Sequence, residues 1–106
     1  MAGVDVSPVM WRQATRRNRH AVREGRVDLR VGEAARLPFE DGSFERALSV
    51  NSLRFWPSPA AGLAEIERTL EPQGRLVLAL RMRREDAGRY DRSRFGMTEK
   101  LSLIHI

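Results

Sequence analysis

The first third of the chain passes from an extended segment to helical spacing. Residues 2–5 are typical of the end of a strand, and Ser7 followed by Pro8 suits the N-cap and first turn of a helix. We predict that this helix continues to about Glu24, because Gly25 suits the left-handed residue that follows a helix. Four apolar positions recur at helical spacing along it: Trp11, Ala14, Ala21 and Val22.

The apolar positions then change from helical spacing to alternation. Val27, Leu29 and Val31 alternate with charged residues, which predicts a strand near a sheet edge with one solvated face. The alternation stops at Gly32, and residues 33–44 are predicted to form a loop. A further strand is predicted after this loop from four apolar positions: Ala47, Leu48, Val50 and Leu53.

A second serine and proline pair begins the next helical segment. Ser58 and Pro59 predict a helix start, and the helix is predicted to continue until Pro72 and Gly74 end it. Residues 76–80 are continuously apolar, as expected of a parallel strand that is covered on both faces.

The remaining residues carry weaker signals. Residues 81–97 are arginine-rich without a pattern and are predicted to form a loop, and Thr98 with Glu99 is predicted to start a helix. The order strand, helix, strand, loop, strand, helix, strand predicts an α/β fold with right-handed crossovers and a mostly parallel sheet.

Length and composition limit the classes of function. A chain of 106 residues allows one domain, with 42% hydrophobic and 31% charged residues. The chain has no cysteine, and its two histidines are far apart, so we predict no disulfide, thiolate or metal site. The longest apolar run is far short of the roughly 20 residues that span a bilayer, and no signal peptide pattern is present. We therefore predict a cytoplasmic protein without a membrane partner.

The net charge raises the question of an acidic partner. The formal charge is +5, and almost all of the positive charge is arginine, since Lys100 is the only lysine. Arginine neutralises phosphate, so a nucleic-acid or other acidic partner is one interpretation. A bias toward arginine in place of lysine is the stronger explanation of the composition and needs no ligand, and no aromatic stripe accompanies the charge. The sequence therefore does not favour nucleic acid, and it leaves the oligomeric state open.

One segment is similar to a known family. Residues 32–44 read Gly-Glu-Ala-Ala-Arg-Leu-Pro-Phe-Glu-Asp-Gly-Ser-Phe, which resembles the adenine-side loop of class I S-adenosylmethionine-dependent methyltransferases. The family has an acidic residue and Ala, then Leu-Pro-Phe, then Asp-x-Ser-Phe and an acid, where Glu45 replaces the commoner Asp. Residues 3–7 resemble the segment after the second strand of the family, and residues 57–74 its fourth helix. The Pro-Gly-Gly turn of the family matches Pro72-Gln73-Gly74, and the resemblance covers about residues 2–82.

The resemblance implies a fold, a cofactor and a set of contacts. It implies a partial Rossmann-like methyltransferase core over residues 1–100, from the second to the fifth strand, that uses S-adenosylmethionine and a small-molecule methyl acceptor. By analogy, Asp5 holds the ribose diol, the Glu33 carboxylate accepts from the adenine amine, and the Ala34 N–H donates to a ring nitrogen. Asp5 also suits the start of the following helix without any ligand. Met10 and Leu37 either pack against the adenine faces or belong to the core.

The predicted end of the fourth strand carries the candidate for the methyl-transfer site. Asn51 lies where the family lines this site, so its predicted role is positional, near the sulfonium; the alternative is that it caps its own strand. Phe55 and Trp56 line an acceptor pocket or seal the core beneath the second helix, and we favour the core.

Two features predict a truncated fragment. The Gly-x-Gly-x-Gly loop with which the family approaches its cofactor is absent, so the first strand, which joins the two halves of the family sheet, is expected to be missing. Residues 101–106, Leu-Ser-Leu-Ile-His-Ile, match a reading of CTG TCT CTT ATA CAC ATC, the mosaic-end adapter of transposase-based libraries, so we expect a non-native tail. The alternatives to a methyltransferase fragment are a basic binding module for nucleic acid or an acidic partner, and an inert fragment.

Overall fold

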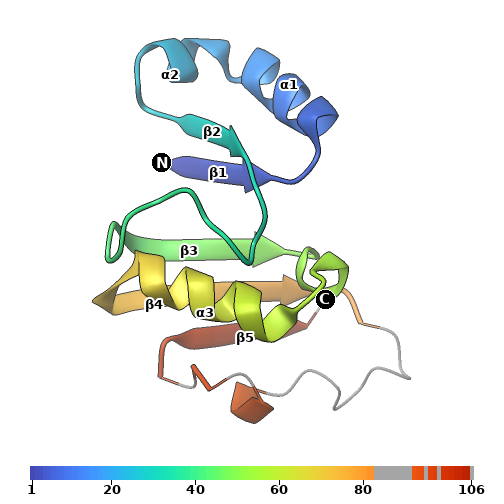
Figure 1. Cartoon of the computed structure of the whole chain (residues 1–106), viewed down its shortest axis with the longest axis vertical. Helices are drawn as coiled ribbons and strands as arrows, with labels where there is room; N and C mark the ends of the chain where they lie inside the picture. Colours follow the sequence, from blue (N-terminus) through green and yellow to red (C-terminus); the bar gives the residue numbers. More distant parts are fainter. Residues whose placement is uncertain (83–91, 95, 98, 106) are drawn as a thin grey trace.

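The computed structural model describes residues 1–82, 92–94, 96, 97 and 99–105. Within these residues, helices and strands alternate for most of the chain (Figure 1). The elements are β1 (Ala2–Asp5), α1 (Pro8–Arg17), α2 (Arg19–Arg23), β2 (Asp28–Val31), β3 (Phe44–Val50), η1 (Leu53–Phe55), α3 (Pro59–Thr69), β4 (Leu70–Leu80), η3 (Arg92–Arg94) and β5 (Leu101–His105).

The strands form two parallel sheets. β1 pairs with β2, and separately β3, β4 and β5 pair in that order, so β1 and β3 are edge strands that do not pair with each other. All the arrows in Figure 1 point the same way, which places the carboxyl ends of both sheets on one side. The predicted α/β class with parallel strands is confirmed, whereas the strands form two separate sheets in place of the single sheet that the order of elements predicted.

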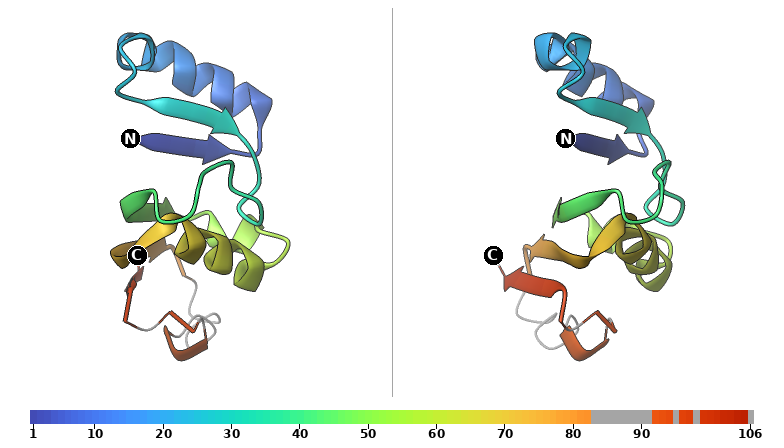
Figure 2. Two further views of the ribbon diagram at one scale, coloured as in Figure 1. Left: turned by 60° about the vertical axis from the view of Figure 1, so that its left-hand side comes forward. Right: turned by 90° about the vertical axis from the view of Figure 1, so that its left-hand side faces the viewer.

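Each sheet has its own helices, and we name the two parts accordingly. The two-stranded unit is residues 2–31, in which α1 contacts β1 and β2. The three-stranded unit is residues 44–80 with 101–105, in which α3 lies along one face of the sheet (Figure 2). The connecting loop, residues 32–43, joins them.

The helix starts predicted at Ser7 and at Ser58 are confirmed. The Ser7 hydroxyl oxygen accepts from the Met10 backbone N–H at 3.3 Å, and the Ser58 oxygen accepts from the Ala61 N–H at 3.2 Å. In both helices a proline follows the cap, where its missing N–H costs no helical hydrogen bond.

The first helical segment differs from the prediction at one residue. Asn18, with φ −113° and ψ 24°, separates α1 from α2, whereas one helix to about Glu24 was expected. The Asn18 side-chain nitrogen donates to the Ala14 carbonyl at 2.8 Å, and this local bond offers the backbone an alternative to a continuous helix. Gly25 has φ 75°, the left-handed conformation predicted for it.

The boundaries around α3 also differ. Leu53, predicted in a strand, is fully buried in η1 instead. The helix ends at Thr69, and β4 begins at once, so Pro72 and Gly74 lie inside the strand rather than at the helix end. The pairing of β3 with β4 shifts register between Phe44 and Arg46, and such a bulge accommodates a proline within a strand.

The C-terminal residues form an unexpected strand. Leu101–His105 is β5, parallel to β4, and the Leu101 side chain is buried. Glu99 lies in a turn, so the predicted helix start there is wrong, while Thr98 and residues 83–91 of the predicted loop lie outside the described residues. An adapter origin for residues 101–106 stays a prediction.

The core lies in the three-stranded unit. Six leucines have at most 1% of their surface exposed: Leu53, Leu63, Leu76, Leu78, Leu80 and Leu101. By contrast, no residue from 1 to 52 is buried. The two units therefore differ in how much apolar surface they remove from water, which is the main source of folding free energy.

Candidate functional site

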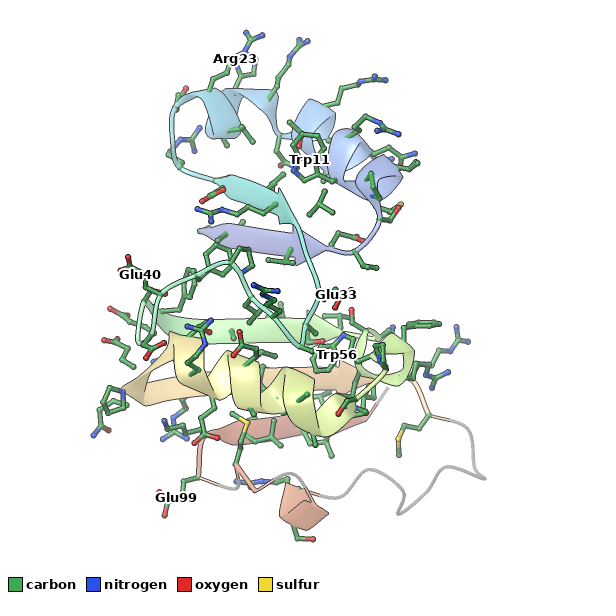
Figure 3. All side chains as sticks on the ribbon, in the orientation of Figure 1. Trp11, Arg23, Glu33, Glu40, Trp56 and Glu99 are labelled. Carbon is green, nitrogen blue, oxygen red and sulfur yellow. The ribbon has the colours of Figure 1, made fainter. Side chains whose placement is uncertain are left out.

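The two candidate carboxylates follow neighbouring strands. β1 and β2 are paired so that Asp5 lies beside Val31, and Glu33 comes two residues after Val31. Figure 3 shows Glu33 beyond the ends of both strands, on the same side of the molecule as Trp56. The pairing thus sets Asp5 and Glu33 at the ends of neighbouring parallel strands, the edge at which parallel α/β sheets bind ligands. Their predicted contacts with a nucleoside stay a prediction.

Asp5 has one local role already. Its Oδ1 accepts from the Ser7 backbone N–H at 2.8 Å, at the start of α1, and its carbonyl accepts from the Gly32 N–H at 3.0 Å. The first bond matches the alternative role considered for this carboxylate. An ionised carboxylate accepts about four hydrogen bonds, so Asp5 retains the capacity to accept from a diol.

Glu33 lies in a tight turn. Its carbonyl accepts from the Arg36 N–H at 3.1 Å, and Ala34 lies between these residues, half-buried. The Glu33 side chain is exposed, so its carboxylate is hydrated and accessible to a ligand. A carboxylate next to backbone N–H groups is the donor and acceptor set that fits an adenine edge.

The two candidate apolar contacts have different surroundings. Leu37 is half-buried and packs against the core cluster of the three-stranded unit, as its alternative interpretation predicted. Met10, on α1, is 50% exposed and is not part of that core.

Arg30 fixes the connecting loop to β2, a contact that the sequence did not predict. Its guanidinium donates to the Pro38 carbonyl at 2.6 Å, lies 5.0 Å from the centre of the Phe39 ring, and pairs with Asp28 at 2.8 Å. The hydrogen bond from Arg30 lowers the pKa of Asp28. Alternation in β2 predicted only that Arg30 would face away from the core.

Asn51 lies at the end of β3 in a left-handed backbone conformation, with φ 55°. Its Oδ1 accepts from the Arg81 N–H at 2.6 Å, and its own N–H donates to the Ala79 carbonyl at 2.7 Å. These bonds tie the end of β3 to the end of β4, as the strand-capping alternative predicted. The predicted position near a sulfonium stays a prediction.

The two aromatic residues after Asn51 separate. Trp56 is half-buried against the core and against Gly62, which agrees with the favoured interpretation. Phe55 is 77% exposed, so the prediction that it seals the core is wrong. In the three-residue helix η1, Leu53 takes the inward position and Phe55 faces outward.

Two further observations concern the described part of the chain. No group of three or more His, Cys, Asp or Glu residues is arranged to hold a metal ion there. None of its helices has the length and apolar character needed to cross a bilayer.

The chain belongs to a methyltransferase family. The family model described as "Methyltransferase domain" matches residues 1–78, which include both carboxylates and the connecting loop. The family assignment made from residues 32–44 is thus confirmed.

Individual relatives agree with this assignment. The chain is 30% identical to the uncharacterized methyltransferase YdaC of Bacillus subtilis, over 89% of the chain and 50% of the relative. It is 39% identical to a demethylmenaquinone methyltransferase of Lactiplantibacillus plantarum, over 71% of the chain and 32% of the relative. The structure matches the trans-methyltransferase CalH in complex with SAH, with a TM-score of 0.61 and 25% identity, over 73% of the chain and 22% of CalH. The chain therefore spans half or less of each of these proteins.

Proposed function

We propose that this chain supplies the adenosine-binding part of an S-adenosylmethionine-dependent methyltransferase. The observation that carries the proposal is the pairing of β1 with β2, which sets Asp5 and Glu33 at the ends of neighbouring parallel strands. When bound, S-adenosylmethionine supplies the methyl group. The residues of this chain bind and orient the nucleoside, with Asp5 accepting from the ribose hydroxyls and Glu33 from the adenine amine.

The proposal also covers the methyl acceptor and the cellular location of the protein. A demethylmenaquinone methyltransferase among the relatives supports a small organic acceptor. Because the described helices are too short or too polar to span a membrane, we propose action in the cytoplasm. No Gly-x-Gly-x-Gly loop occurs in the 106 residues, so we propose that this chain contacts the adenosine portion of the cofactor and not its amino-acid portion.

An NMR titration of the whole chain tests the proposal that it contacts only the adenosine portion of the cofactor. Adenosine and S-adenosylhomocysteine are expected to shift the amide signals of Asp5, Gly32 and Ala34 to the same extent, with similar affinity. Guanosine is expected to shift them far less, because its carbonyl oxygen replaces the amine that Glu33 accepts from and would repel the carboxylate. Equal shifts with guanosine, or none with adenosine, would refute the proposal.

Asn51 is proposed to act at the same edge, next to the position of the sulfonium. Its support is its place at the carboxyl end of β3, on the side of the sheets where Asp5 ends β1. Asn51→Gly is the suitable variant, because glycine keeps the left-handed backbone while it removes the amide. In wild type, S-adenosylmethionine is expected to shift the Asn51 side-chain amide signals while adenosine does not, because only the former carries the sulfonium. Equal Asn51 shifts with the two ligands, or none with either, would assign Asn51 to strand capping alone.

A further inference from the structure

The connecting loop is fastened to the last turns of α3 through both backbone groups of one residue. The Leu37 N–H donates to Glu65 Oε1 at 2.9 Å, and the Leu37 carbonyl accepts from Arg68 Nη2 at 3.1 Å. Since Leu37 and α3 are far apart in sequence, this is a tertiary contact and not a local turn. It fixes the loop backbone four residues after Glu33.

Arg68 extends the attachment to a second point of the loop. Its Nη1 donates to Asp41 Oδ1 at 2.7 Å, and its carbonyl accepts from the Gly42 N–H at 2.9 Å. Two further bonds hold the guanidinium itself, from Nε to Glu65 Oε2 at 2.8 Å and from Nη2 to Glu65 Oε1 at 3.0 Å. One planar guanidinium thus contacts two carboxylates and a carbonyl at once, which a lysine ammonium does not reproduce.

The attachment is partly shielded from water. The side chains of Glu65 and Arg68 are 20% and 31% exposed, whereas that of Asp41 is 83% exposed. The hydrogen bonds from Arg68 and from the Leu37 N–H lower the pKa of Glu65, and the pKa of Arg68 is raised by its two carboxylate partners. Both groups therefore stay charged at neutral pH.

The loop is held on its other side by Arg30, whose guanidinium bonds to the carbonyl of Pro38. Residues 37–42 therefore lie between an arginine of the two-stranded unit and an arginine of the three-stranded unit. The loop begins with Glu33 and Ala34, so its fixed middle section limits the conformations that these two residues adopt.

We propose that Glu65 and Arg68 are positioning residues for nucleoside binding, because they fix the loop that presents Glu33 and Ala34. The inference rests on the proposed function, and it gives two residues of α3 an indirect part in nucleoside binding. Neither residue contacts the nucleoside; they act by reducing the conformational freedom that binding would otherwise remove.

Amide hydrogen exchange and adenosine titration of the whole chain test the proposal together. Arg68→Gln is expected to raise exchange at Leu37 and Gly42 by roughly tenfold and to weaken adenosine binding by roughly threefold to tenfold. Arg68→Lys should give an intermediate effect. The control is Glu67→Gln, an exposed carboxylate of the same helix for which the structure gives no side-chain contact, and it should change neither quantity.

The pH dependence of the protection of the Leu37 amide distinguishes a positioning role of Glu65 from a general loss of stability in its variants. The pKa of Glu65 is lowered in the folded chain. Its contribution to the stability of the loop attachment is therefore present above the ordinary pKa of 4.5, and this contribution is lost as the pH falls through the lowered pKa. The protection of the Leu37 amide should fall over this range in wild type and be independent of pH in Glu65→Gln. Arg68 and Asp41 are the other charged groups at this point, so Asp41→Asn serves as the control that keeps the pH dependence.

Each result has a defined meaning. Unchanged exchange in Arg68→Gln overturns the attachment, and faster exchange with unchanged adenosine affinity overturns its role in binding. If wild type shows no adenosine shifts while exchange responds to Arg68→Gln, the proposed function fails and the attachment stands. Faster exchange together with weaker binding supports both.

Discussion

The two units of this chain differ in their content: the three-stranded unit holds the hydrophobic core, and the two candidate carboxylates lie outside it. The three-stranded unit contains all six fully buried leucines, whereas the two-stranded unit and the start of the connecting loop have no buried residue and carry the two candidate carboxylates, Asp5 and Glu33 respectively. Ligand sites often lie in parts of a protein that gain little stability from packing. The comparison indicates that Asp5 and Glu33 depend on the three-stranded unit, through the connecting loop, for a fixed position.

Truncation of apolar side chains should give the largest difference between the two units in the loss of unfolding free energy. Leu78→Ala removes a fully buried side chain of β4 and is expected to cost about 2–5 kcal/mol. Leu29→Ala, at a half-buried position of β2, should cost clearly less. Urea unfolding measures both losses, with Trp56 fluorescence in a Trp11→Phe background for Leu78→Ala and Trp11 fluorescence in a Trp56→Phe background for Leu29→Ala. An equal or larger loss for Leu29→Ala would contradict the contrast.

A smaller effect is expected from overpacking within the three-stranded unit. A Cβ added at Gly62 would lie 2.5 Å and 2.9 Å from two ring atoms of Trp56, so the indole must move. Gly62→Ala should lower stability by about 1–3 kcal/mol despite the better helix propensity of alanine, and it should shift the Trp56 emission. Ala64→Gly, at an exposed position of the same helix, is the control and should leave the emission unchanged. A stabilised Gly62→Ala would show that the indole moves freely.

The two helix caps provide one matched pair of variants, with one capping serine in each unit. Ser7→Ala and Ser58→Ala each remove one hydroxyl that accepts from a backbone N–H, at a cost of about 0.5–2 kcal/mol. Loss of Ser7 should affect mainly the two-stranded unit, where Trp11 donates to the Leu29 carbonyl at 2.7 Å and reports on the packing of α1. Loss of Ser58 should move the Trp56 transition. A single shared transition in both variants would mean that the units unfold together.

Local chemistry made much of the fold predictable from the sequence. The pairs Ser7-Pro8 and Ser58-Pro59 identify helix starts because the serine hydroxyl and the proline ring both stabilise the first turn of the helix, without contacts to distant residues. The alternation in residues 27–31 identifies β2 because one face is solvated. The resemblance of residues 32–44 to the family loop gives Asp5 and Glu33 roles at one ligand, and the pairing of β1 with β2 is consistent with this.

What the sequence did not predict depends on contacts between distant residues. Arg68 lies among 18 arginines, and nothing in its own helix distinguishes a residue that binds the connecting loop from one that faces solvent. The burial of Leu53 depends on α3 and β4, which follow it. β5 was missed because residues 101–106 were interpreted as a non-native tail, although Leu101 and Leu103 alternate with Ser102 as in a strand.

The central claim is that Glu33 binds a nucleoside at the end of β2. The most direct measurement compares the adenosine affinity of Glu33→Ala with that of Glu40→Ala, at a second exposed carboxylate of the same loop, which Figure 3 places toward the opposite end of the strands. We predict that Glu33→Ala weakens binding by about 1–3 kcal/mol, because it removes the acceptor of the adenine amine, and that Glu40→Ala does not. Equal affinity of both variants and wild type would contradict the claim.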